Sequence, residues 1–148
     1  MKFSIALLFA LLSCSVNATE CLDAPNSLDP IRHLEKSSDV LFGTVIGGKL
    51  KSNVRRGEIA VDFSIAKPIK GNKSGVIQLR SPMYTHFAIG YSYIVYLYGS
   101  NEIKPCAMVI ELMPAIESME ALYHQSQRTD VNFGKDLRKL LNHVGYKP

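Results

Sequence analysis

The sequence predicts a mainly β domain with flanking helices. Five short segments rich in β-branched and aromatic residues follow one another through the middle of the chain, and turn residues separate them. Helical patterns stand before and after these segments. Consecutive strands followed by helices favour an antiparallel sheet with the helices packed outside it. The 148 residues suffice for one domain of ordinary size.

The first 18 residues have the pattern of a secretory signal peptide. Lys2 supplies a short positive segment, residues 3–12 form an apolar run, and residues 16–18 end in Ala18, a small residue that suits cleavage. Cleavage there leaves one domain, residues 19–148, which we expect to be periplasmic or secreted. No later apolar run reaches the roughly 18 to 20 residues that a membrane-spanning helix needs.

The alternative location is the membrane surface, to which a lipid anchor would attach the protein. Residues 11–14, Leu-Leu-Ser-Cys, loosely resemble a bacterial lipobox, in which Cys14 would be acylated. Charge gives little further information about partners. Residues 1–18 hold one lysine and no acidic residue, so their removal lowers the formal charge from +4 to +3. This mildly basic balance does not indicate a nucleic-acid partner.

Two cysteines remain after cleavage of the signal peptide, Cys21 and Cys106. An even pair in an exported protein predicts a disulfide. The bridge would close a loop of about 85 residues, which in the chain-entropy model stabilises the fold by roughly 4 to 5 kcal/mol. The alternative is two free buried thiols.

The first half of the domain begins with a helix and a buried strand. The Ser-Leu-Asp-Pro start of residues 27–36 predicts a short helix. Residues 39–46 are apolar on both faces, which predicts a buried strand. Gly47 and Gly48 permit a bend or a bulge. Residues 49–57 are polar and basic and predict a hairpin loop.

Further strands follow. Residues 59–66 alternate between large apolar and polar or small side chains, as in a strand with one core face. Pro68 ends this strand or marks an edge. Residues 70–75 predict a turn, and residues 76–79 a short strand.

Residues 91–98 form a strongly β-prone run. Its four tyrosines fall in two pairs on opposite faces, which favours packing in the core over a stacking platform on one face. Residues 99–101 predict a turn, and residues 106–112 a fifth strand. Apolar residues at helical spacing predict helices over about residues 114–144. Five strands with a glycine bend in the first are what a small Greek-key barrel of the OB type requires.

Several motifs occur in a characteristic order: Cys21, the strand at residues 39–45, the strand at residues 61–65 leading to Lys70 and Gly71, the block Phe87-x-x-Gly90-x-x-Tyr93-Ile94-Val95-Tyr96, and Cys106. In this order and spacing they resemble the netrin-module and tissue-inhibitor-of-metalloproteinase (TIMP)-like family, including its small bacterial exported members. The resemblance covers most of residues 21–112. It implies an OB barrel, in agreement with the strand count.

The N-terminus departs from the animal inhibitors that this family contains. Those inhibitors resemble one another in a Cys-x-Cys sequence at the mature N-terminus. The amine and the carbonyl of the first cysteine coordinate the zinc ion of the protease. Here residues 19–21 read Thr-Glu-Cys, and the partner of the missing cysteine, expected near Thr85, is absent too. Loss of both partners of one bridge leaves Cys21 with Cys106 and argues against zinc chelation. Metalloprotease inhibition stays an alternative function.

Signatures of catalysis do not occur in the sequence. The four histidines fall in no H-E-x-x-H motif and no zinc spacing, and no G-x-S-x-G motif or phosphate loop is present. We therefore expect no catalytic residue, no metal site and no cofactor. A hydrolase or metal-binding enzyme that uses His86 with acidic residues is the remaining alternative.

Basic residues cluster in the first predicted hairpin loop: Lys49, Lys51, Arg55 and Arg56. In OB folds this loop and the neighbouring strand face bind oligosaccharides or single strands. The cluster is a weak candidate site for an acidic glycan, a lipid headgroup or an acidic protein surface, and the alternative is a solvated hairpin tip. The sequence thus predicts an exported, non-enzymatic binding module that contacts a protein or an anionic envelope component.

Overall fold

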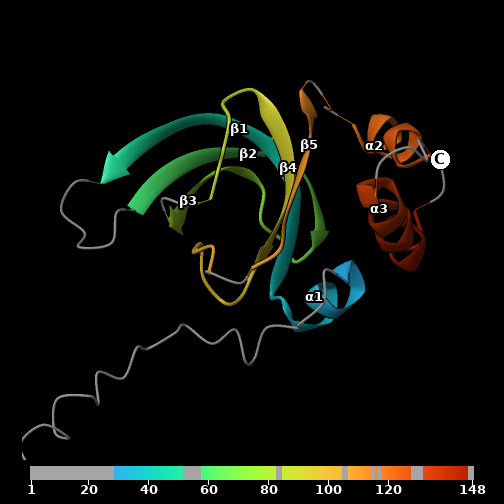
Figure 1. Ribbon diagram of the computed structural model, residues 1–148. Helices are drawn as coiled ribbons and strands as arrows, with labels where there is room; N and C mark the ends of the chain where they lie inside the picture. Colours follow the sequence, from blue (N-terminus) through green and yellow to red (C-terminus); the bar gives the residue numbers. More distant parts are fainter. Residues whose placement is uncertain are drawn as a thin grey trace, which may run out of the picture.

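The computed structural model describes residues 29–51, 58–82, 85–104, 107–114, 116, 118–127 and 132–146. The described elements are, in chain order, α1 (Pro30–Lys36), β1 (Asp39–Lys51), β2 (Glu58–Lys70), β3 (Gly75–Pro82), β4 (Tyr91–Leu97), β5 (Val109–Pro114), α2 (Met119–Ser126) and α3 (Asn132–His143). The predicted mainly β class with flanking helices is confirmed (Figure 1). The signal segment and both cysteines of the predicted disulfide lie outside the described residues.

The first two strands are longer than the sequence predicts. β1 continues through its glycines to Lys51, so the prediction that residues 49–51 belong to a loop is wrong. β2 likewise continues past Pro68 to Lys70. The β1–β2 register is irregular between Val40 and Leu41, which stand opposite Lys70 and Pro68, and again between Phe42 and Gly43 and between Val45 and Gly47. A strand accommodates a proline where the ladder is already irregular.

The strands form one antiparallel sheet in the order β3-β2-β1-β4-β5. The central strand β1 pairs with β2 along its whole length and with β4 only from Asp39 to Thr44. A further contact joins β3 to the connection between β4 and β5. Arg80 and Glu102 form an isolated parallel bridge, in which the Arg80 amide donates to the Asn101 carbonyl and the Ile103 amide to the Arg80 carbonyl, both at 2.8 Å.

Each face of the sheet packs into its own apolar cluster. The inner cluster lies on the concave face and takes its fully buried side chains from β1 to β4 and from Ile103; they are Leu41, Val45, Val61, Phe63, Leu79, Tyr93, Val95, Leu97 and Ile103. Val109 of β5 packs against it. The outer cluster joins Val40 and Phe42 of β1 to the three helices. In Figure 1, α2 and α3 lie together beside β5, and α1 lies next to the start of β1. The prediction that residues 39–46 are buried on both faces holds for residues 39–43 and for Val45, whereas Thr44 is half-buried and Ile46 is exposed.

Helix α1 starts at the predicted Asp-Pro pair. The Asp29 carboxylate accepts a hydrogen bond from the Ile31 amide at 3.1 Å, and Pro30 occupies the first turn. Lys139 of α3 also contacts Asp29, at 2.9 Å, so the cap links the first helix to the last. Among the helices described, none combines the length and the apolar composition needed to cross a bilayer.

Candidate functional site

The structure places part of the predicted basic cluster on a strand. Lys49 is exposed on β1 opposite Ala60, and the backbone of Lys51 pairs with Glu58. The Lys51 side chain and both arginines of the cluster, at positions 55 and 56, lie outside what the structure describes. The two lysines therefore stand on paired strand backbone just before the hairpin tip.

Beyond Thr44, one edge of β1 has no described strand beside it. A bulge at Ile46 follows, because Val45 is opposite Phe63 while Gly47 is opposite Asp62. Large apolar side chains are exposed at this end of the sheet, with 52% of Ile46 and 62% of Leu50 accessible to solvent. Such an edge offers unpaired backbone groups and apolar surface to a partner.

The connection between β3 and β4 adds to the same region. The Gly90 amide donates to the Val45 carbonyl at 2.8 Å, so this connection contacts β1 where the pairing with β4 has ended. Ile89, next to that bond, is 69% exposed. We use the term hairpin end for this region: β1 from Ile46 to Lys51, with Ile89 beside it.

A pocket of about 320 Å³ lies between the two connections that flank β4. It is lined by Thr85, His86, Tyr93, Lys104, Ala107, Val109 and Glu111. Three of these residues, Tyr93, Ala107 and Val109, also pack in or against the inner cluster. Tyr93 is fully buried, so the half-buried Ala107 and Val109 supply the apolar part of the pocket surface, and the polar and charged residues supply the rest.

Tyr93 is fully buried behind this pocket and holds the connection between β3 and β4 in place. Its hydroxyl accepts a hydrogen bond from the Ala88 amide at 2.8 Å, and its ring meets Phe87 edge to face at 4.9 Å. Burial, and to a lesser extent the charge of Glu111, raise the pKa of Tyr93, and the Ala88 amide opposes that rise. Tyr93 is thus a neutral, fixed side chain at neutral pH.

His86 is exposed on the rim of the pocket and forms no ion pair with a described carboxylate. Within the residues that the structure describes, no three His, Cys, Asp or Glu side chains are grouped to hold a metal ion. The enzyme alternative built on His86 accordingly gains no partner from the described residues.

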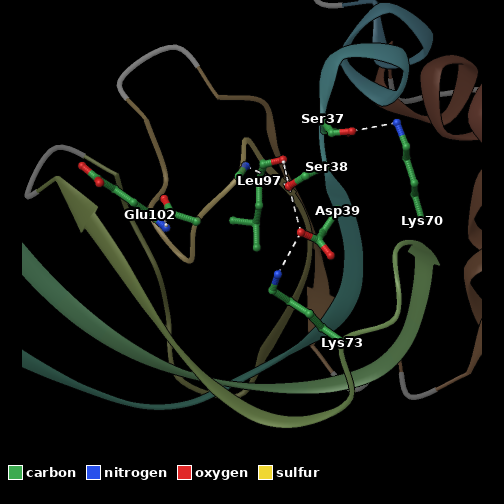
Figure 2. Close-up of polar contacts among 9 residues, drawn as sticks. Ser37, Ser38, Asp39, Lys70, Lys73, Leu97 and Glu102 are labelled. Atoms are coloured by element: carbon green, nitrogen blue, oxygen red, sulfur yellow. Dashed lines mark hydrogen bonds and ion pairs between the residues drawn. The ribbon is translucent and has the colours of Figure 1, made fainter.

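A second polar cluster joins the start of β1 to the turn after β2 (Figure 2). Asp39 is buried and accepts hydrogen bonds from Lys73 at 2.9 Å and Ser38 at 2.8 Å. Lys70 donates to three carbonyls at the end of α1, including that of Ser37 at 2.7 Å. All of these groups satisfy one another, so we interpret the cluster as a structural clamp.

The tyrosines of β4 follow the predicted split between the two faces. Tyr91 and Tyr93 pack with the inner cluster, whereas Tyr96 and Tyr98 pack with the outer one. Tyr98 shares a hydrogen bond of 2.5 Å with Nδ1 of the buried His33. Core packing of these tyrosines is confirmed.

Sequence reasoning did not identify Lys104 and Glu111 as site residues. The signal available in the sequence was that Glu111 interrupts the apolar run of β5; its position opposite Tyr93 is seen only in the strand register. Lys104 offered none, because its placement depends on a contact with β3. No protein-family model matches this sequence, and no curated protein matches it either.

Proposed function

We propose that this chain is an exported, non-enzymatic binding module with a TIMP-like OB barrel, and that it contacts a protein or an anionic envelope component through the hairpin end. The observation that carries the proposal is the strand order. β1, β2 and β3 are consecutive neighbours and β4 returns beside β1, which is the spatial order of a Greek key. The non-enzymatic part of the proposal rests on the sequence, in which we find no signature of catalysis.

Two further observations support closure of the sheet into a barrel. The parallel bridge between Arg80 and Glu102 joins one outer strand, β3, to the chain that leads into the other, β5. The inner cluster takes side chains from four strands, and β5 adds Val109 to it. A sheet whose concave face is filled by its own side chains in this way is typical of small barrels.

The hairpin end is the surface that supports binding best. The first hairpin loop is one of the regions through which OB folds bind ligands. Here Lys49 and Lys51 precede it at the end of β1, and exposed Ile46 and Leu50 lie on the same strand. Cations attract an acidic partner, while apolar side chains beside an open strand edge suit a protein surface better than a glycan.

The test is recovery of the mature protein, with whatever it binds, from the envelope fraction of its host. A variant with alanine at Lys49, Lys51, Arg55 and Arg56 should lose the partner that the unchanged protein retains. A control variant removes the same number of positive charges elsewhere, at Arg32, Lys67, Lys135 and Arg138. It should retain the partner.

Equal capture by the hairpin variant and the unchanged protein would refute the hairpin end as the contact surface. Loss of the partner in both variants would show that binding depends on the net charge of the protein and not on the hairpin end. If the unchanged protein recovers no specific partner, the proposal of a binding module is itself wrong.

A further inference from the structure

The pocket on the other side of β4 carries an inference independent of the proposed function. Its apolar lining that a ligand can reach consists of the half-buried Ala107 and Val109, which pack against the inner cluster, while Tyr93 is fully buried behind them. Lys104 and Glu111 stand on the rim and are exposed. Within the described residues, neither forms an ion pair with the other or with a third side chain.

Both charged side chains project from backbone that is fixed. Glu111 lies on β5 and is paired in register with Tyr93. Lys104 follows Ile103, which is 2% exposed and donates its amide to the Arg80 carbonyl at 2.8 Å. The Lys104 carbonyl in turn accepts from the Ala107 amide at 2.9 Å. A ligand therefore meets charges whose backbone positions need little ordering, which favours binding.

The size and polarity of the pocket define a ligand class. A volume of about 320 Å³ is at the lower end of small-molecule sites. Lys104 and Glu111 do not pair with each other, so they suit a ligand that carries one negative and one positive charge. The half-buried Ala107 and Val109 offer a small apolar surface beside these charges, which suits a short aliphatic group.

We infer that this pocket binds a small zwitterion of the amino-acid class with an aliphatic side chain. The ligand carboxylate faces the Lys104 ammonium, its ammonium faces the Glu111 carboxylate, and its side chain packs on Ala107 and Val109. Thr85 and His86 add hydrogen-bonding groups on the remaining part of the rim.

The first arm of the test varies the ligand on the unchanged mature protein. L-Leucine is compared with 4-methylpentanoate, which lacks the ammonium, and with 3-methylbutylamine, which lacks the carboxylate. Amide shifts of Lys104, Val109 and Glu111 in NMR titrations report the affinity. We expect each analogue to bind at least about tenfold more weakly than L-leucine, because each loses one charge-assisted contact.

The second arm pairs each ligand charge with a protein charge. Lys104→Ala should weaken L-leucine at least about tenfold and leave 3-methylbutylamine unchanged, since the amine has no carboxylate to lose a partner. Glu111→Gln should weaken L-leucine similarly and leave 4-methylpentanoate unchanged. Lys135→Ala, which removes an exposed lysine of α3 that belongs to neither proposed site, is the matched control and should leave L-leucine binding unchanged.

Several results would overturn the inference. Absence of L-leucine binding at 10 mM, or equal binding of L-leucine and either analogue, contradicts the zwitterion class; this concentration is on the order of the weakest affinity that matters for a small metabolite. Variants that weaken every ligand alike contradict the charge assignment. The first arm needs no substitution, so it decides the matter even if a variant fails to fold.

Discussion

Asp39 is the clearest case in which a single residue holds separate parts of the chain together. It is buried at the start of β1; its partner Lys73 belongs to the turn after β2, and its partner Ser38 to the short connection between α1 and β1. Burial alone would raise the pKa of Asp39. The two hydrogen bonds and the charges of Lys73 and Lys70 outweigh burial and lower that pKa below its ordinary value.

The lowered pKa fixes the sign of a pH dependence. The carboxylate contributes stability above the ordinary Asp pKa of about 3.9, and this contribution is lost as the pH falls through the lower folded-state pKa. We expect Asp39→Asn to lower the free energy of unfolding at pH 7 by about 1–3 kcal/mol. Because the variant has no carboxylate to protonate here, its deficit should shrink at pH 3.

Urea unfolding at pH 7 and pH 3 measures both quantities. Asp62→Asn is the matched control, since Asp62 is only partly buried and accepts one side-chain hydrogen bond, from Gln78 at 3.3 Å. It should change stability by less than about 1 kcal/mol at pH 7. An Asp39→Asn deficit that is the same at both pH values would contradict the assignment.

At the scale of the residue, the sequence predicted the environment of those side chains that depend on local structure alone. The alternation of residues 91–98 was enough to divide Tyr93 from Tyr96. It did not predict the clamp, because Lys73 reaches Asp39 across 34 residues of sequence. Contacts of that range depend on how the strands are ordered, which periodicity does not encode.

At the scale of the element, the pairing of β1 with β2 requires a glycine at position 43, where β2 packs closely against β1. A Cβ atom at Gly43 would overlap the Ser64 carbonyl and lie 2.8 Å from the Phe63 ring. The sequence predicted the bend at Gly47 and Gly48. The structure has a register irregularity there and another beside Gly43. Composition alone does not reveal which glycine in a strand faces a close neighbour.

Two alanine substitutions in the same strand separate the effect of contact from that of strand propensity. Gly43→Ala should lower the free energy of unfolding by about 1–3 kcal/mol or more, because backbone must shift to admit the methyl group. Gly48→Ala should change it by less than about 1 kcal/mol, since the nearest atom, the Ala60 carbonyl oxygen, is 3.5 Å away. Chemical denaturation of both variants provides the comparison, and equal effects would show that close packing at Gly43 is not the cause.

At the scale of the whole molecule, the sheet packs on both faces at its centre, whereas the outward side chains of β3 are exposed. Helices bury the outer face of β1, and the strands bury the inner face among themselves. The number of strands and their class were predictable from periodicity and turn residues. The strand order and the contact of residues 101–103 with β3 were not, because long-range pairing leaves no local signal in a single sequence.

The predicted disulfide is a property of the whole chain, since it would tie the N-terminus to the segment before β5. Reduction of the mature protein should lower its free energy of unfolding by about 4 to 5 kcal/mol. Denaturation with and without reductant measures the difference. A Cys21→Ser and Cys106→Ser double variant should be insensitive to reductant. Two titratable thiols in the purified mature protein, with no effect of reductant, would disprove the bridge.

The most direct test of the account is amide hydrogen exchange at Arg80 and Ile103, measured by NMR on the mature protein. The barrel proposal requires the two hydrogen bonds between β3 and residues 101–103 to persist in solution. We predict that both amides exchange as slowly as those of the paired core strands β1 and β4. Exchange of both at the rate of an open loop, while β1 and β4 stay protected, would contradict a closed sheet.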